Sequence, residues 1–207
     1  ILWFVSPVVA YGISQPSSPR KILLSKAQVL FLRHLARKNW AFFEHFVTEK
    51  SHWLPPDNFQ EAPVSVLAHR TSPPNIGLML LANLAAYDFG YVSMGMMFNR
   101  TEKTFDTLNL LEKFRGHFYN WYDTETLKPL LPLYISSVDS GNLAGHLMVL
   151  PSGLAEMNSH KIVSTKIFDG LGETLDILQQ SLAELEKSPK SQKSSVVRTC
   201  WPRRRMA

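Results

Sequence analysis

The 207-residue sequence contains one cysteine, Cys200, so the chain can form neither an internal disulfide framework nor a cysteine-based zinc site. The seven histidines show no spacing typical of a metal site. A glycine-rich loop for phosphate and a nucleophile elbow are also missing. We therefore expect no metal site, no cofactor and no nucleotide-triphosphate chemistry within this chain.

Acidic residues are absent from the segment 188–207, which carries six lysines and arginines. The formal net charge of the chain is +5, so the remainder has a net charge of −1 once these six charges are removed. The basic balance belongs to the tail, and we expect no nucleic-acid partner. Low apolar content without periodicity predicts that 188–207 is a disordered or non-native basic tail.

The N-terminal apolar run, residues 1–14, is shorter than the roughly 20 residues that span a bilayer. A signal peptide would carry its positive charge before the apolar run, whereas Arg20 and Lys21 follow it here. One interpretation is a buried strand or loop. We assign 1–21 instead to the end of a transmembrane helix and a linker, with the two basic residues on the cytoplasmic side.

Strand-like alternation of any length is missing from the rest of the chain, which predicts a mainly α fold. Apolar residues recurring every three or four positions, together with capping residues, predict helices at 25–47, 72–90, 93–116, 139–150 and 171–185. Pro151 is expected to interrupt the fourth helix. Long loops rich in aromatics and prolines between the helices suggest stacked helical hairpins over 22–187.

Aromatic residues concentrate between positions 40 and 134, which hold 17 of the 23. Many lie in predicted loops beside carboxylates and amides, at 53–61, 69–73, 117–124 and 137–142. Sugar rings offer apolar faces to aromatic rings and hydroxyls to Asp or Asn, so this combination favours a carbohydrate site. The candidate residues are Trp53, Asp57, Asn58, Arg70, Asn120, Trp121, Tyr122, Asp123, Asp139 and Asn142.

Each candidate has a structural alternative. Asp57 and Asp139 could cap helices or stabilise turns. Arg70 and His69 could form ion pairs with loop carboxylates, or could bind phosphate. Trp121 and Tyr122 could belong to the core.

The ordered motifs WLPPDNFQE (53–61), AHRTSPPNIGL (68–78), LANLAAYDFGY (81–91), GHFYNWYDT (116–124) and VDSGNLAGHL (138–147) resemble cyclic β-1,2-glucan synthases. These are large, multi-domain enzymes of the bacterial inner membrane. The resemblance covers roughly residues 1–150. It places the chain after a membrane-embedded glycosyltransferase domain and at the start of a glucoamylase-like domain.

The resemblance implies that 22–187 forms the first helical hairpins of an incomplete (α/α)6 toroid on the cytoplasmic side. It implies UDP-glucose as the donor of the parent enzyme, β-1,2-glucan as the ligand, and a transglycosylation that closes the glucan ring. The catalytic carboxylate pair would lie further along the parent chain, so the ten candidates would contact glucan or position loops, and the fragment alone would be inactive. The alternatives are a phosphorolytic β-glucan enzyme on the same scaffold and a non-catalytic glucan-binding module.

Overall fold

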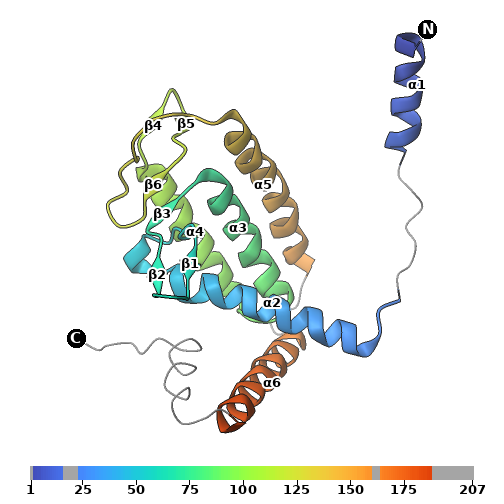
Figure 1. Ribbon diagram of the computed structural model, residues 1–207, viewed down its shortest axis with the longest axis vertical. Helices are drawn as coiled ribbons and strands as arrows, with labels where there is room; N and C mark the ends of the chain where they lie inside the picture. Colours follow the sequence, from blue (N-terminus) through green and yellow to red (C-terminus); the bar gives the residue numbers. More distant parts are fainter. Residues whose placement is uncertain (1, 16–22, 160–163, 188–207) are drawn as a thin grey trace. The chain divides into compact units, whose positions relative to one another are not determined.

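The computed structural model describes residues 2–15, 23–159 and 164–187 (Figure 1). The chain divides into two compact units, residues 1–32 and 33–207, which are treated separately below. The predicted tail 188–207 lies outside the described residues.

The first unit contains helix α1 (Leu2–Ser14) and the start of helix α2 (Lys26–Phe46). The strand-or-loop alternative for the N-terminal run is therefore wrong. Within the described part of the chain, no helix has both the length and the apolar character needed to cross a membrane. The predicted capping box at the start of α2 is confirmed, because Ser25 N–H donates to Gln28 Oε1 at 2.8 Å and Gln28 N–H donates to Ser25 Oγ at 3.3 Å.

Helices α3 (Pro73–Asp88) and α4 (Met94–Leu110) form a helical hairpin in the second unit. Ser93 caps α4 as predicted, because its Oγ accepts a hydrogen bond from Met96 N–H at 3.2 Å. Gly90 lies in the connecting turn with φ of +79°, a conformation that ends a helix at little cost only for glycine.

Helix α4 ends six residues before the predicted Gly116. That glycine, with φ of +85°, lies instead in the turn between strands β4 (Lys113–Phe114) and β5 (His117–Phe118), which pair antiparallel. Glycine with a positive φ occurs in hairpin turns as well as at helix ends. The prediction that Gly116 ends the helix is therefore wrong, because it forms the hairpin turn instead.

Helix α5 (Ser137–Glu156) begins after its cap Ser136 and continues through Pro151 into the 3₁₀ turn η2 (Met157–Ser159). The predicted interruption at Pro151 is therefore wrong. Proline removes only one backbone hydrogen-bond donor from the helix. Burial of the Leu143 and Leu150 side chains stabilises the helix and compensates for this lost bond.

Helices α3 and α5 pack side by side and run in the same direction (Figure 1). A Cβ at Gly77 on α3 would lie 2.6 Å from His146 Nδ1 on α5, and seven residues later a Cβ at Gly153 would lie 2.7 Å from Leu84 Cδ1. Each helix therefore contributes a glycine against which a larger side chain of the other helix packs. In stacked helical hairpins, each helix packs in parallel against a helix of the next hairpin and antiparallel against its own hairpin partner. The packing of α3 against α5 and α4 is this arrangement, as predicted.

Short strands pair the loop segments that connect the helices (Figure 1). Strand β1 (Phe59–Gln60) pairs with β2 (Val66–Leu67), and β3 (Arg70–Thr71) pairs with β6 (Tyr122–Asp123), both antiparallel. A 3₁₀ turn, η1 (Glu49–Ser51), follows α2. The core that supports them includes the fully buried side chains of Leu54, Ile76, Met79, Leu80, Met97 and Tyr122.

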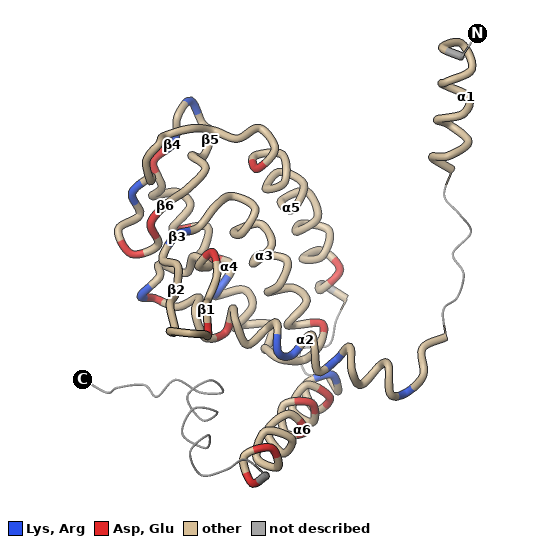
Figure 2. Tube along the Cα trace, viewed as in Figure 1, with Lys and Arg blue, Asp and Glu red and all other residues tan. Residues whose placement is uncertain are grey.

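Helix α6 (Lys166–Lys187) makes polar and backbone contacts with α2, with the end of α3 and with the turn after α3. The buried Glu173 pairs with Arg33 and accepts a hydrogen bond from Tyr91 Oη at 2.7 Å, and burial raises the pKa of Tyr91 above its usual value. The predicted leucine stripe is one face of this helix, but Leu171, Leu175, Leu178 and Leu182 remain about half exposed. Figure 2 shows acidic residues along the same helix.

We predict that Gly90→Ala lowers the free energy of unfolding of the full chain by at least about 2 kcal/mol. A Cβ there would lie 1.9 Å from the Lys166 carbonyl oxygen, and a positive φ strains alanine. Gly172→Ala is the matched control, because no heavy atom lies within 4 Å of its Cβ position inside α6. The control should gain up to about 1 kcal/mol in urea unfolding. Equal stability of the two variants would contradict this account of the α6 attachment.

Candidate functional site

The pairing of β3 with β6 places the site residues from two distant loops on one small sheet (Figure 1). Arg70 is the partner of Asp123, and Thr71 is the partner of Tyr122. Because side chains alternate along a strand, Thr71 and Tyr122 face the core and are fully buried, while Arg70 and Asp123 face outward.

Arg70 joins the strand β3 to the loop that precedes β1. Its Nε and Nη2 donate to Asp57 Oδ2 at 3.1 and 2.9 Å, and this guanidinium is half exposed. Asp57 also accepts from Asn58 Nδ2 at 3.1 Å and from Asn75 Nδ2 at 3.3 Å. The Asp57 carboxylate therefore links the loop before β1 to β3 and to α3. The contact with Arg70 agrees with the ion-pair alternative for Arg70.

Trp121 extends this arrangement on the other side of Arg70. The guanidinium carbon of Arg70 lies 4.7 Å from the centroid of the Trp121 ring, a cation–π contact. With the Asn120 side-chain amide oriented so that its oxygen faces donors and its nitrogen faces an acceptor, the indole Nε1 of Trp121 donates to the Asn120 oxygen at 3.0 Å. The tryptophan is partly buried, so its ring is fixed at both a face and an edge while some of its surface stays accessible.

Asn120 is the buried centre of the polar contacts, with only 5% of its surface exposed. Its amide oxygen accepts from Trp121 Nε1 and from Tyr134 Oη, the latter at 2.6 Å, and its amide nitrogen donates to Asp139 Oδ2. This amide orientation gives every polar atom a complementary partner, which a buried amide requires. The backbone N–H of Asn120 donates to the Tyr134 carbonyl at 3.0 Å.

These contacts join six of the ten candidates into one continuous set, which we call the Arg70–Trp121 cluster: Asp57, Asn58, Arg70, Asn120, Trp121 and Asp139. The residues come from the loop before β1, from β3, from the segment before β6 and from the first turn of α5. The cluster combines carboxylates and amides with a partly accessible indole, which are the groups that can bind sugar hydroxyls and sugar faces.

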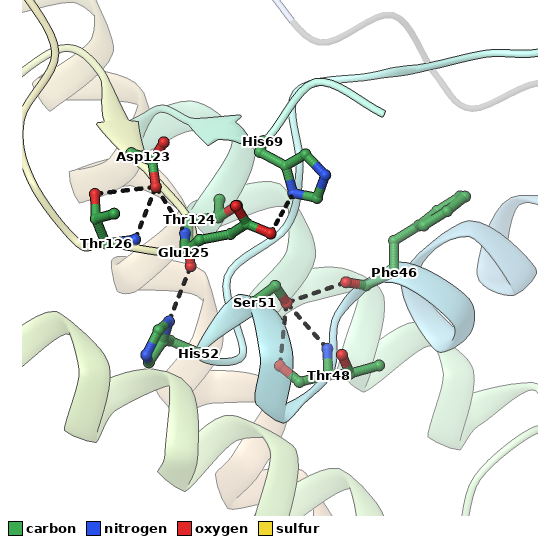
Figure 3. Close-up of polar contacts among 9 residues, drawn as sticks. All are labelled: Phe46, Thr48, Ser51, His52, His69, Asp123, Thr124, Glu125 and Thr126. Atoms are coloured by element: carbon green, nitrogen blue, oxygen red, sulfur yellow. Dashed lines mark hydrogen bonds and ion pairs between the residues drawn. The ribbon is translucent and has the colours of Figure 1, made fainter. Parts of the chain in front are cut away.

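Asp123 accepts hydrogen bonds from residues of its own turn (Figure 3). Its Oδ1 accepts hydrogen bonds from the N–H groups of Glu125 at 2.9 Å and Thr126 at 2.7 Å, and from the Thr126 hydroxyl at 3.0 Å. Partial burial acts to raise the pKa of the Asp123 carboxyl, but these hydrogen bonds outweigh it, so the pKa lies below its ordinary value. These hydrogen bonds indicate that Asp123 stabilises the turn 123–126.

The remaining candidates lie apart from the cluster contacts. Tyr122 is fully buried, its hydroxyl donates to the Glu112 carbonyl at 2.7 Å, and burial raises its pKa to about 12, all of which fits the core alternative. Trp53 packs against α4, with Lys103 Nζ 4.7 Å from its ring centroid. Asn142 is exposed on α5.

The phosphate alternative for His69 and Arg70 receives no support from their surroundings. His69 Nδ1 lies 3.5 Å from Glu125 Oε1, as Figure 3 shows, and Arg70 is paired with Asp57. Each basic group therefore already faces a carboxylate. Within the described ranges, no three His, Cys, Asp or Glu side chains gather in a way that could hold a metal ion.

Two contributors to the site were missing from the candidates. Asn75 lies in the 68–78 motif, and Tyr134 ends the aromatic-rich region. An amide and a phenol are typical of a carbohydrate site, so their residue types were a usable signal. Their hydrogen-bond partners, Asp57 for Asn75 and Asn120 for Tyr134, lie 18 and 14 residues away across irregular loops.

The chain is 42% identical over 195 residues to the cyclic β-(1,2)-glucan synthase NdvB of Rhizobium meliloti (strain 1021). It is homologous to a short segment of that synthase. The alignment covers 92% of this chain and 7% of the synthase, so the chain spans a small part of the relative's length. The resemblance inferred from the loop motifs is thereby confirmed. No family model matches the sequence.

The fold is similar to that of a crystal structure from Bacteroides fragilis NCTC 9343, a protein provisionally classed as a glucoamylase. The TM-score is 0.52 at 20% sequence identity, and the match covers 77% of this chain and 36% of the other. The predicted fold class, mainly helical and part of a glucoamylase-like α/α toroid, is confirmed.

We predict that Asp123→Asn lowers stability at neutral pH by up to about 1 kcal/mol, since asparagine keeps the acceptor but not the charge. A carboxylate with a lowered folded-state pKa stabilises the fold above its unfolded-state pKa, and this contribution is lost as the pH falls through the folded-state value. Urea unfolding across acidic to neutral pH should show the difference from wild type vanishing at the acidic end. Asn142→Ser, a neutral exchange at an exposed site, should show no such pH dependence. A constant difference for Asp123→Asn would contradict the assignment.

Proposed function

We propose that this chain is part of a membrane enzyme that synthesises β-1,2-glucan from UDP-glucose and cyclises it, and that this part contributes glucan-binding loops to the transglycosylation domain. The identity with NdvB and the glucoamylase-like helical fold both support this proposal. The parent enzyme resides in the bacterial inner membrane, with this domain on the cytoplasmic side. The N-terminal segment and the remaining domains of the parent chain link it to the membrane.

The observation that carries the proposal is the Arg70–Trp121 cluster itself. Four separate chain segments bring an indole, two carboxylates and two amides together without a metal-type constellation. Arg70 is neutralised by Asp57, so the cluster offers hydrogen bonds and aromatic surface to a ligand more than it offers net charge. A neutral polyhydroxyl chain such as β-1,2-glucan is the ligand class that suits these groups.

The carboxylates of the cluster position loops or bind sugar hydroxyls in this proposal and do not exchange the glycosidic bond. A retaining transfer needs a nucleophile and an acid/base about 5 Å apart, both free to react. Asp57 is occupied by Arg70, Asn58 and Asn75, and Asp139 accepts from Asn120. The resemblance to cyclic β-1,2-glucan synthases implies a catalytic pair further along the parent chain, and these contacts agree with that. In the first step the nucleophile displaces a glycosidic oxygen of the glucan, the acid/base protonates that oxygen, and the glucan portion beyond the cleaved bond leaves. In the second step the acid/base deprotonates a hydroxyl at the other end of the enzyme-bound glucan, and this oxygen displaces the nucleophile to close the ring.

We predict that Trp121→Ala in the full-length synthase raises the KM for linear β-1,2-glucan about tenfold, because aromatic stacking on a sugar contributes on the order of 1.4 kcal/mol. Trp121→Phe keeps a stacking face and should fall between the alanine variant and the wild type. The measurement is the formation of cyclic glucan from linear β-1,2-glucan at a series of concentrations. Phe98→Ala is the control, because Phe98 is exposed on α4 outside the cluster.

Wild-type KM in both Trp121 variants would contradict the site assignment. Release of glucose 1-phosphate that depends on inorganic phosphate would favour the phosphorolytic alternative. Glucan binding by a parent protein that has no turnover would favour the non-catalytic module.

A further inference from the structure

Tyr134 shares a single acceptor atom with Trp121. The hydroxyl of Tyr134 and the indole N–H of Trp121 both donate to the side-chain oxygen of Asn120, at 2.6 and 3.0 Å. Two donors bonded to one oxygen must have their polar edges close together. The polar edges of the two rings therefore meet at the buried Asn120 side chain.

The ring of Tyr134 is exposed yet held in place. Its exposed fraction is 45%, which for an aromatic side chain in a loop normally means freedom to rotate. Here the hydroxyl is bonded to the Asn120 amide, and the Tyr134 carbonyl accepts the Asn120 backbone N–H at 3.0 Å. Part of the Tyr134 surface is therefore accessible to a ligand, while its hydroxyl is bonded within the protein.

Asp139 completes the arrangement from the first turn of α5. Its Oδ2 accepts from the Asn120 amide nitrogen, and its side chain is partly exposed. A carboxylate offers more acceptor positions than this one bond uses, so capacity remains for ligand hydroxyls. Asn120 thus orients two aromatic rings and one carboxylate at the same time.

We infer that Trp121, Tyr134 and Asp139 form one subsite for a hexopyranose unit, with Asn120 as its positioning residue. The inference rests on the proposed function and adds Tyr134 to it as a ligand-contacting residue. Two ring surfaces bind the apolar faces of the sugar, and the Asp139 carboxylate accepts from its hydroxyls. Asn120 is buried and bonded at both its side-chain oxygen and its side-chain nitrogen, which supplies the rigidity that lowers the entropic cost of binding.

The chemistry of the subsite excludes an anionic ligand. Arg70, the basic residue of the cluster, is paired with Asp57 and stacks on Trp121, and Asp139 would repel an anion. A phosphate or nucleotide therefore has no unpaired cation to bind in this cluster, whereas a neutral sugar ring needs none.

The test uses the full-length synthase with linear β-1,2-glucooligosaccharides as the probe. Tyr134→Ala should raise KM at least fivefold and leave kcat within twofold, because it removes a binding surface and no reacting group. Tyr134→Phe keeps the ring but releases its edge, and should raise KM about twofold. Asn120→Ala should show the same split between KM and kcat as Tyr134→Ala. Phe98→Ala, at 43% exposure, is the matched control and should behave as wild type.

Wild-type KM for Tyr134→Ala together with impaired Trp121→Ala would overturn the subsite and leave the proposed function standing. Wild-type KM in both would overturn the proposed function as well. If Tyr134→Ala fails to fold, Tyr134→Phe decides: a raised KM at unchanged kcat supports the subsite, and wild-type KM refutes it.

Discussion

The antiparallel pairing of Arg70–Thr71 with Tyr122–Asp123 is the constraint on which the candidate site depends. It joins loops about 50 residues apart, and the buried Thr71 and Tyr122 anchor both strands in the core. With this register set, Arg70 reaches Asp57 on one side and Trp121 on the other. A shift of one residue would turn Arg70 toward the core and leave its charge unpaired, which makes slippage costly.

The helical scaffold keeps this sheet in place through close contacts between neighbours. Reciprocal packing of Gly77 against His146 and of Gly153 against Leu84 fixes α3 against α5, and α5 supplies Asp139 at its first turn. The position of the acidic side chain in the site is therefore set by packing along the whole helix. A polar cluster supported in this way can keep one geometry while the exposed surfaces of its aromatic rings contact a ligand.

Local rules predicted much of this from the sequence, and long-range packing decided the rest. Ser25 and Ser93 begin helices because their capping partners lie only three residues away. Pro151 broke the local rule, since burial of the same helix outweighed one lost hydrogen bond. The residue types of the site were recognisable from their motifs. The contacts among these residues could not be predicted from the sequence. Asn120 bonds to Trp121, Tyr134 and Asp139 because of the loop conformation, and hydrophobic periodicity carries no information about loop conformation.

In the proposed site, the cluster around Asn120 holds a sugar unit of the glucan. The most direct measurement is a structure of the full-length synthase bound to a linear β-1,2-glucooligosaccharide. The account predicts a glucose ring against the faces of Trp121 and Tyr134, with a hydroxyl bonded to Asp139. A bound oligosaccharide that leaves both rings and this carboxylate without sugar contacts would contradict it.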